Sequence, residues 1–486
     1  MSANDDDDDD KNPIEQFDED DEEMKKRRKK LTRKIDCRIL PMICIIYLVS
    51  YLVRSNIANA KLAGLEADLK ITANEYLWSL SIFFVGYTLF EVPSNIVLRR
   101  WRPSRWLAVI HIALGIVSMC MGAVQNAAGL LACRFFLGVI EAGLFPGIVY
   151  YLSIWYPRKQ QAVRVGLFWS ISALSGAFSG ILAYGISQIG SSSMGKWRLI
   201  FIIEGAPNII VAILCWFLLP DSPEKAKFLN DEERQLKIDS LAEDAGPTKE
   251  EKFSWSQVFS VFKDWKAYFY AIIYITGLIA LQGITLSLPV IIKEFGTWTT
   301  LQTQLMTIPP NMAAFFVILI VSRSSDYFME RSLHTTFVNL FAIGGFLMLI
   351  FVDEKQVGVL YAGIILAAIG VYSSVSVRTA WYNNNFASLT RRATASAMIV
   401  SIGVSGGIVS GQIYSDKQKP RYIIGHTISL VCMTVQTILV IILRCVLMII
   451  NKRRKQMSDE QIQQEVDKYG GEESVGDRHP KFQYTL

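Results

Sequence analysis

Long apolar segments recur along the whole chain, with short polar stretches between them. We count about twelve, each close to the roughly 20 residues that a helix needs to cross a bilayer. They form two groups of six, at 37–57, 77–98, 105–124, 129–152, 164–187 and 198–219, then at 267–292, 303–322, 335–352, 357–388, 392–412 and 425–450. Because lipid cannot satisfy backbone polar groups, such segments fold as helices. The sequence predicts an all-α integral membrane protein of about 12 transmembrane helices in two six-helix bundles.

Composition and charge agree with this class. The chain is 51% hydrophobic and only 19% charged over 486 residues, which excludes an ordinary soluble domain. The acidic start of the chain cannot form a core, so we expect a disordered tail there. The expected divisions are a disordered cytoplasmic tail at 1–36, a first bundle at 37–219, a cytoplasmic linker at 220–266, a second bundle at 267–450 and a cytoplasmic tail at 451–486.

Lysine and arginine indicate the orientation. Basic clusters occupy alternate polar segments, at 25–30, 99–105, 157–164, 391–392 and 452–455. The excess of basic residues predicts that these segments, and both termini, are cytoplasmic. The net charge of +5 comes from these loops and indicates no nucleic-acid partner. We expect a multi-pass protein of the cell membrane, in contact with lipid, monomeric, and without a cleavable signal peptide.

Two charges stand inside the fourth apolar segment, LLACRFFLGVIEAGLFPGIVYYL. Arg134 and Glu141 are seven residues apart, so on one continuous helix they share a face and lie about 10 Å apart along its axis. Charges at membrane depth are costly and usually face a bundle interior or a cavity. A cation beside a titratable carboxylate is an arrangement expected of a transporter for an anion.

Arg54 lies at a matching depth in the first apolar segment. Two arginines at one depth could hold one carboxylate, because the guanidinium fork suits that planar group. Alternatively, Arg54 extends to the outer membrane interface. Glu141 is the candidate proton-coupling group, with a plain ion pair to an arginine as the alternative.

Polar residues of the second half supply further candidates for substrate binding. They are Gln282 in the seventh segment and Arg378, Trp381 and Asn384 in the tenth. Buried amides need hydrogen-bond partners, which a substrate or a neighbouring helix can provide. The seven cysteines form no CxxC pair and do not cluster with the four histidines, so we expect no metal site and no disulfide framework. No catalytic motif stands out, so we expect no enzyme and no cofactor, only a proton as coupling ion.

Several longer strings are typical of one family. They are RSNIANAKLAGLEADL (54–69), FFVGYTLFEVPSN (83–95), RFFLGVIEAGLFPGIVYYLSIWYPRKQQAVRVGLF (134–168), KWRLIFIIEGAPNII (196–210), LPDSPEKAKFLNDEER (219–234) and PRYIIGH (420–426). With them the chain resembles the major facilitator superfamily, and within it the anion:cation symporters of the fungal allantoate and nicotinate permease group. The resemblance implies the major facilitator fold, substrate-binding roles for Arg54, Tyr87 and Arg134, and proton coupling through Glu141.

Two positions depart from the family pattern. Val53 stands where the family usually has an aspartate, and Val404 where it often has an asparagine. The first leaves Glu141 as the main carboxylate for coupling, and the second bears on substrate choice. The expected function is proton-coupled symport, by alternating access, of a small organic anion such as nicotinate, allantoate or a related vitamin or nitrogen compound. The alternatives are an uncoupled facilitative uniporter and a membrane nutrient sensor on a transporter scaffold.

Overall fold

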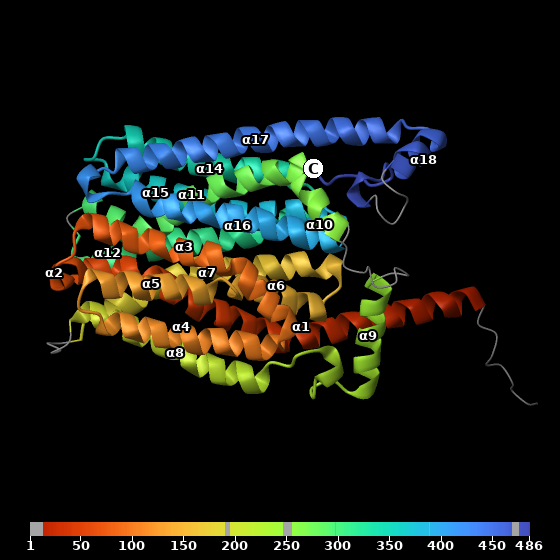
Figure 1. Ribbon diagram of the computed structural model, residues 1–486, viewed down its shortest axis with the longest axis horizontal. Helices are drawn as coiled ribbons and strands as arrows, with labels where there is room; N and C mark the ends of the chain where they lie inside the picture. Colours follow the sequence, from red (N-terminus) through yellow and green to blue (C-terminus); the bar gives the residue numbers. More distant parts are fainter. Residues whose placement is uncertain (1–12, 190–194, 246–254, 297, 388, 469–475) are drawn as a thin grey trace, which may run out of the picture.

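The computed structural model describes residues 13–189, 195–245, 255–296, 298–387, 389–468 and 476–486. Every regular element among them is a helix, and 12 helical spans are long and apolar enough to cross a bilayer. The helices lie side by side along the long axis of the molecule (Figure 1). The predicted all-α fold with about 12 spanning helices in two bundles is confirmed. The acidic run Asp5–Asp10 lies outside the described residues.

The first half of the chain supplies six spans, with α5 and α6 sharing one of them. Within this half α4 packs on α8, α3 on α5, and α1 on α7 and α8. The helices are α1 (Pro13–Leu62), α2 (Leu65–Leu69), α3 (Ala73–Arg100), α4 (Pro103–Ala123), α5 (Ala127–Glu141), α6 (Leu144–Trp155), α7 (Arg158–Ser187) and α8 (Lys196–Leu218).

The second half repeats this plan after a connecting stretch that contains α9 (Asp231–Ala245) and α10 (Trp255–Phe262). Here α14 packs on α15, and α11 packs on α16 and α17. The helices are α11 (Trp265–Phe295), α12 (Thr300–Met306), α13 (Ile308–Phe328), α14 (Ser332–Phe351), α15 (Val357–Asn384), α16 (Leu389–Ile413), α17 (Ile423–Lys455) and α18 (Asp459–Lys468).

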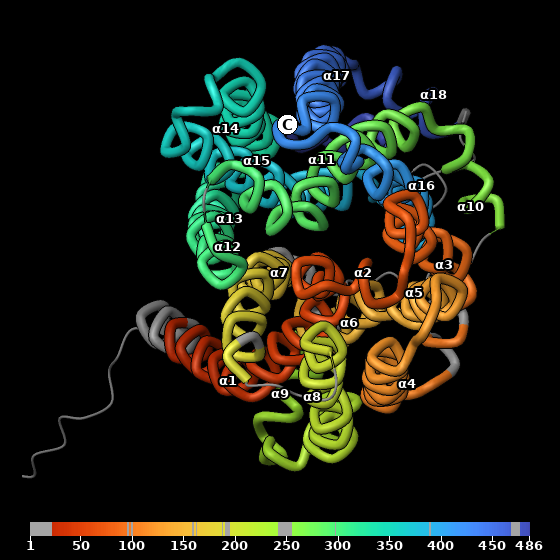
Figure 2. Tube along the Cα trace, turned by 90° about the vertical axis from the view of Figure 1, so that its left-hand side faces the viewer, coloured from red at the N-terminus to blue at the C-terminus, as the bar shows by residue number. Residues whose placement is uncertain are grey.

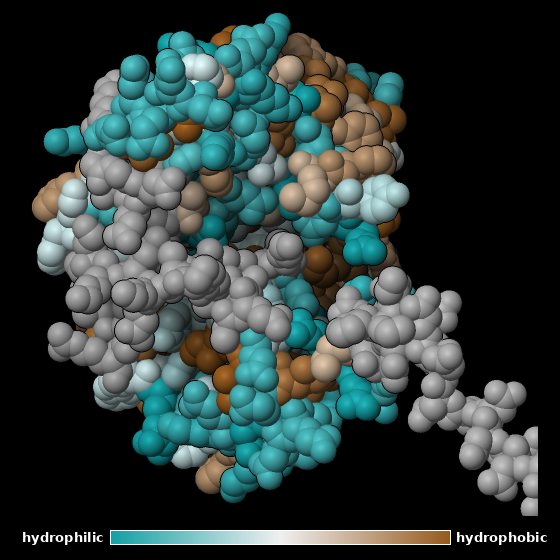
Figure 3. Space-filling view, turned by 90° about the vertical axis from the view of Figure 1, so that its right-hand side faces the viewer, coloured by the Kyte–Doolittle hydropathy of each residue, from teal (hydrophilic) through white to brown (hydrophobic). Residues whose placement is uncertain are grey.

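The beginning of α1 and the end of α17 lie at the same end of the molecule (Figure 1). We call this the terminal end and the opposite one the distal end. Figure 3 views the terminal end and shows hydrophilic residues over much of it. Large apolar side chains remain exposed on the flanks, including Phe217, Ile320 and Phe351 at 78%, 66% and 79%. A polar end and apolar flanks fit a molecule that stands across a bilayer.

The two halves form two groups of helices that face each other (Figure 2). They meet where α16 packs on α3 and α13 on α7. Small residues make the first of these contacts close, because a Cβ at Gly407 would lie 2.1 Å from Cδ1 of Phe84. Ser401 on α16 also donates a hydrogen bond to Glu91 on α3, over 3.1 Å. At the contact between α16 and α3 the two halves are therefore closely packed.

The N-terminal tail corrects one expectation. Residues 1–36 were expected to be disordered, but α1 begins at Pro13 and continues into the first span without a break. Ion pairs one turn apart line its polar part, with Glu23 2.9 Å from Arg27. Such pairs stabilise a helix modestly, and the membrane-spanning part of α1 supplies the nucleus from which the helix extends.

The fourth span is also different from the single helix expected. It is broken between α5, which ends at Glu141, and α6, which begins at Leu144. Pro146 explains the break, because proline has no backbone N–H to donate to the carbonyl of Ala142 and its ring crowds that carbonyl. Glu141 is therefore the last residue of a helix in the middle of a span.

The C-terminal segment 476–486 packs onto the terminal end of the second half. Asn385 and Thr485 exchange two hydrogen bonds between the amide side chain and the backbone, of 2.8 and 2.9 Å. Asp477 is fully buried and pairs with Lys266 and with Arg391, whose Nε lies 3.1 Å away. The part of the tail that the structure describes here is an integral part of the second half.

Candidate functional site

A cavity between the two halves lies about midway along the helices, and we call it the central cavity. Four helices of the first half and two of the second contribute to its lining. Its lining comprises Tyr47 and Arg54 of α1, Phe84 and Tyr87 of α3, Phe145 of α6, Trp169 of α7, Tyr274, Leu278 and Gln282 of α11, and Val400 and Val404 of α16. Of the candidates from sequence, Arg54, Tyr87 and Gln282 line this cavity. Arg54 is the charged member of the lining.

Arg54 is held in an aromatic setting. Its guanidinium carbon lies 4.9 Å from the ring centre of Phe83 and 5.4 Å from that of Tyr87. Its Nε lies 3.4 Å from Oε1 of Glu141, an ion pair in which neither Nε nor the second carboxylate oxygen has a hydrogen-bond partner among the described residues. Arg54 is only 7% exposed, so it lies in the interior and does not extend to the membrane interface. The loose pairing leaves part of the guanidinium available to another anion.

Arg134 does not reach the central cavity. Its Nε donates to the carbonyl oxygen of Ser79 over 3.1 Å, and its Nη1 donates to that of Arg54 over 3.4 Å. The ring of Phe83 contacts both guanidinium groups, at 5.2 Å from Arg134. The two arginines therefore do not face one ligand. Because α5 packs tightly on α3, Arg134 is enclosed behind Arg54 and holds the backbones of α1 and α3.

Glu141 lies behind Arg54 as seen from the central cavity. It is 5% exposed and does not belong to the cavity lining. Val53, which stands where the family usually has an aspartate, is fully buried in the apolar core. Among the described residues, Glu141 is therefore the carboxylate that pairs with Arg54.

Three candidates of the second half are displaced from the central cavity. Arg378 is 1% exposed, and the ring of Tyr274, which lines the cavity, lies 4.8 Å from its guanidinium carbon. Trp381 donates its Nε1–H to the carbonyl of Thr485 over 2.8 Å, and Asn384 is the last residue of α15. The terminal half of α15 faces its own bundle and the C-terminal segment, which is why these residues do not line the cavity.

Sequence reasoning missed the aromatic wall of the central cavity. Phe145 and Trp169 pack edge to face with ring centres 5.9 Å apart, and Tyr47 lies 6.2 Å from Trp169. Aromatic residues are frequent in every span of this chain, so their sequence positions give no signal. Val404, the departure from the family pattern that bears on substrate choice, does line the central cavity.

The distal end of the interface is closed by an ion pair between the halves. Nζ of Lys61, near the end of α1, lies 3.0 Å from Oδ1 of Asp416, in the connection between α16 and α17. Lys61 also lies 3.2 Å from Glu66. No group of His, Cys, Asp and Glu able to hold a metal ion is found in the part of the chain that the structure describes. The lining of the central cavity itself offers one cation, an amide and aromatic rings, with the carboxylate of Glu141 paired to that cation.

Residues 43–411 match the sequence profile of the Major Facilitator Superfamily. The chain is 34% identical to the MFS-type transporter efuF of Hormonema carpetanum. The alignment of 394 residues covers 81% of this chain and 80% of that protein. It is 33% identical over 396 residues to the major facilitator-type transporter hxnP of Emericella nidulans, which covers 80% of each. An uncharacterised transporter of Schizosaccharomyces pombe is 36% identical over 407 residues, covering 84% and 81%.

Solved structures agree on the fold. The proton:xylose symporter XylE superposes with a TM-score of 0.63 at 14% identity, over 82% of this chain and 95% of that one. A bacterial homologue of the lysosomal transporter Spinster, in an inward-facing conformation, superposes with a TM-score of 0.59 at 15% identity, over 83% and 94%. The protein is a multi-pass membrane transporter, not an enzyme, and it belongs to the Major Facilitator Superfamily.

Proposed function

We propose that this transporter imports a small organic anion together with protons by alternating access. The observation that carries the proposal is Arg54, the charged residue of the central cavity lining, held loosely by a single carboxylate. A buried guanidinium attracts an anion, and its planar fork suits a carboxylate. The positive-inside pattern supports a cytoplasmic terminal end, and on that basis the distal end faces outward.

The walls of the central cavity favour a planar substrate. Tyr87, Trp169 and Tyr274 offer ring faces, and the Oε1 of Gln282 has no hydrogen-bond partner among the described residues. Aromatic faces bind flat groups by offset or edge contacts, and the amide can bond a ring nitrogen or an amide of the ligand. Nicotinate fits this chemistry well, in line with the resemblance to the nicotinate and allantoate permease group among anion:cation symporters.

Proton coupling follows from competition for Arg54. When Glu141 is ionised, it pairs with Arg54 and reduces the attraction of that cation for a substrate carboxylate. A proton on Glu141 removes this competitor, so that anion and proton bind together. Since position 53 is a buried valine, no aspartate stands there to share the role. The other substrate-site candidates, Arg134, Arg378, Trp381 and Asn384, act at most by shaping the bundles around this pair.

Alternating access requires that the distal contact opens. In the present conformation Lys61 and Asp416 join the halves at the distal end. Rocking of the halves would break this ion pair and expose the cavity on the outer side, after which its closure commits the ligand inward. Transport across the plasma membrane as a monomer is the simplest arrangement, because both halves of the cavity come from one chain.

Reconstitution in liposomes tests the proposal. We expect inward uptake of at least one of nicotinate, allantoate, pantothenate and short peptides, and accumulation only with an inward proton gradient. If Glu141 is the sole coupling group, Glu141→Gln should abolish accumulation but retain exchange of substrate across the membrane. Uptake that ignores the gradient would indicate a uniporter. No uptake of any anion by a folded protein would contradict transport of this class and favour the sensor alternative.

A further inference from the structure

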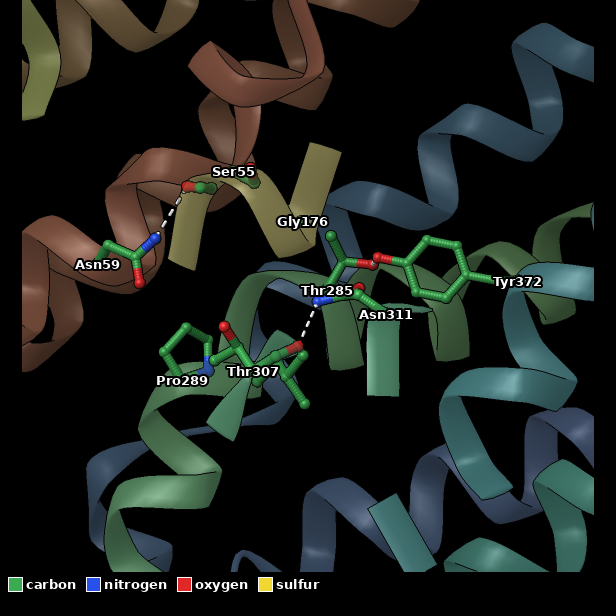
Figure 4. Close-up of a pocket in the computed structure, with 10 residues that line it drawn as sticks. Ser55, Asn59, Gly176, Thr285, Pro289, Thr307, Asn311 and Tyr372 are labelled. Atoms are coloured by element: carbon green, nitrogen blue, oxygen red, sulfur yellow. Dashed lines mark hydrogen bonds between the residues drawn. The ribbon is translucent and has the colours of Figure 1, made fainter. Parts of the chain in front are cut away.

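A second polar cavity lies nearer the distal end of the same interface, and we call it the distal cavity (Figure 4). Asn59 faces it from the first half, and Thr307 and Asn311 from the second. Its remaining lining residues are Ser55, Gly176, Ser179, Thr285, Leu288, Pro289 and Tyr372. Arg54 lines the central cavity and its neighbour Ser55 lines the distal one. The two cavities are therefore neighbours along α1 at the interface of the halves, and we call this line of cavities the path between the halves.

A carboxylic side chain lies directly behind the wall of the distal cavity. Glu204 on α8 is fully buried, and Ser179 Oγ donates a hydrogen bond to its Oε1 over 3.2 Å. Asn59 Nδ2 in turn donates to Ser179 Oγ over 2.9 Å. Because Asn59 and Ser179 both line the cavity, a short chain of polar atoms joins Glu204 to the path between the halves.

No positive charge balances Glu204 among the described residues. Its Oε2 has no hydrogen-bond partner and it takes part in no ion pair there. The basic groups on the helices around it have ion-pair partners of their own: Arg54 pairs with Glu141, Lys61 with Asp416 and Glu66, and Arg198 with Asp68. His111 is bonded to Ser50 and to two backbone carbonyls. Tyr184 and Lys196 also have contacts of their own.

The absence of a balancing charge favours the neutral acid. An ionised carboxylate buried without a cation or enough donors is strongly disfavoured, and such a group usually takes a proton instead. Glu141 differs, because Arg54 lies beside it. Glu141 and Glu204 thus have opposite environments, because Glu141 lies next to a cation and Glu204 is bonded to a hydroxyl.

We propose that Glu204 is a second proton-binding site, loaded from the distal cavity through Ser179. This proposal rests on the proposed function. When Glu204 is ionised, the hydroxyl of Ser179 gives its proton to Oε1 of Glu204. The hydroxyl takes a proton in turn from a hydronium ion in the cavity, which is left as water, so that atoms and charge balance. Asn59 holds the hydroxyl in line for this transfer. The proton returns to water by the same route when the path opens at the terminal end. Each cycle then carries two protons, one on Glu141 and one on Glu204.

The second proton changes the electrical character of transport. A monocarboxylate that moves with one proton carries no net charge, whereas with two protons it carries one positive charge. Uptake by the unaltered protein should therefore respond to an inside-negative membrane potential. Replacing Glu204 by glutamine should remove that response without removing the coupling through Glu141.

The ratio of protons to substrate is measured in proteoliposomes from the proton gradient that just balances a known substrate gradient. This ratio depends on stoichiometry and not on rate. We expect two for the unaltered protein and one for Glu204→Gln. Glu91→Gln serves as control, since Glu91 is also buried and bonds Ser401 across the halves, and should keep the ratio of two. An unchanged ratio in Glu204→Gln, or a ratio of one in the unaltered protein, would overturn the inference.

A second measurement is independent of transport. Infrared spectra of the purified protein should contain the carbonyl band of a protonated carboxylic acid that Glu204→Gln loses and Glu141→Gln keeps; absence of that loss would contradict the inference. Ser179→Ala should keep the ratio of two but slow proton-driven uptake several-fold. Failure of the proposed function looks different, because then the unaltered protein shows no gradient-driven uptake of any of the four anions.

Discussion

Nε of Arg54 lies 3.4 Å from Oε1 of Glu141, and neither group takes part in a second ion pair among the described residues. Two buried charges at this distance stabilise each other only by offsetting the cost of removing both from water. Removing one of the two charges leaves the other buried without a partner, so that its cost of removal from water is no longer offset. The carboxylate of Glu141 and the carboxylate of the substrate therefore compete for the guanidinium of Arg54, and a proton on Glu141 decides the competition in favour of the substrate.

Substitution of Arg54 should separate binding from folding. In Arg54→Lys the charge remains but the planar fork is lost, so we expect KM for the substrate to rise about tenfold or more with little change in stability. In Arg54→Ala, Glu141 is left buried without its cation, which should cost about 3–5 kcal/mol unless the carboxyl takes up a proton. Uptake kinetics and thermal unfolding in detergent measure the two effects. The double variant Arg54→Ala/Glu141→Ala should be more stable than Arg54→Ala, and the opposite order would contradict the role of the pair.

The ion pair of Lys61 and Asp416 should hold the distal end closed. Lys61→Met removes it, and a partly buried pair of this kind contributes about 1 kcal/mol, equivalent to a roughly fivefold shift in the ratio of conformations. Spin labels at the exposed positions Lys70 and Glu354, one on each half at the distal end, should report longer distances in pulsed electron resonance. Lys355→Met, at an exposed loop position, is the control. Equal distance distributions in both variants would show that the pair does not hold the halves together.

The fold could be predicted because its main signal is local. Hydropathy over about 20 residues locates a span without knowledge of its neighbours. The break after Glu141 was not predicted, although Pro146 is a local signal that could have indicated it. The site was harder. Arg54, Tyr87 and Gln282 face the central cavity. Arg134 was assigned there as a costly buried charge and Arg378 as a buried polar group, and neither argument says which face of the helix meets which neighbour.

Contacts between distant segments explain the other residues that the structure places away from the central cavity. Trp381 donates its indole hydrogen bond to the carbonyl of Thr485, more than 100 residues later in the chain. No pattern around either residue indicates that contact. Glu204 was likewise not among the site candidates, since a single glutamate in an apolar span gives no sign of the chain through Ser179 to the distal cavity. Such features depend on packing, which sequence periodicity does not specify.

Close packing of α5 on α3 should make Gly138 intolerant of any side chain. A Cβ at Gly138 would lie 1.9 Å from the carbonyl oxygen of Phe83, a backbone atom that cannot easily move. We expect Gly138→Ala to destabilise the protein by about 1–3 kcal/mol or more. Gly344 in α14 is the matched control, because a Cβ there meets nothing within 4 Å and Gly344→Ala should stabilise by about 0.5–1 kcal/mol through helix propensity. Thermal unfolding in detergent should move in opposite directions, and a shift of the same sign in both would contradict this account.

Asp477 should anchor the C-terminal segment in a pH-dependent way. Burial raises the pKa of its carboxyl, but Lys266 and Arg391 outweigh burial and hold that pKa below its ordinary value of 3.8. Since the pKa is lowered in the folded state, the ionised form is the stabilising one. Its contribution is complete above the unfolded pKa, unchanged near neutral pH, and lost as the pH falls through the folded pKa.

Hydrogen exchange in residues 476–486 measures this contribution. Asp477→Asn should speed exchange there at neutral pH, because the C-terminal segment loses the anion that pairs with Lys266 and Arg391, while Asp264 remains paired with both. The difference from the unaltered protein should stay constant from about pH 8 to 5 and shrink below the ordinary aspartate pKa. Asp459→Asn, at an exposed position of α18, should change neither the exchange rate in residues 476–486 nor its dependence on pH. A difference that grows as the pH falls would reverse the assigned sign and contradict the ion pairs as its cause.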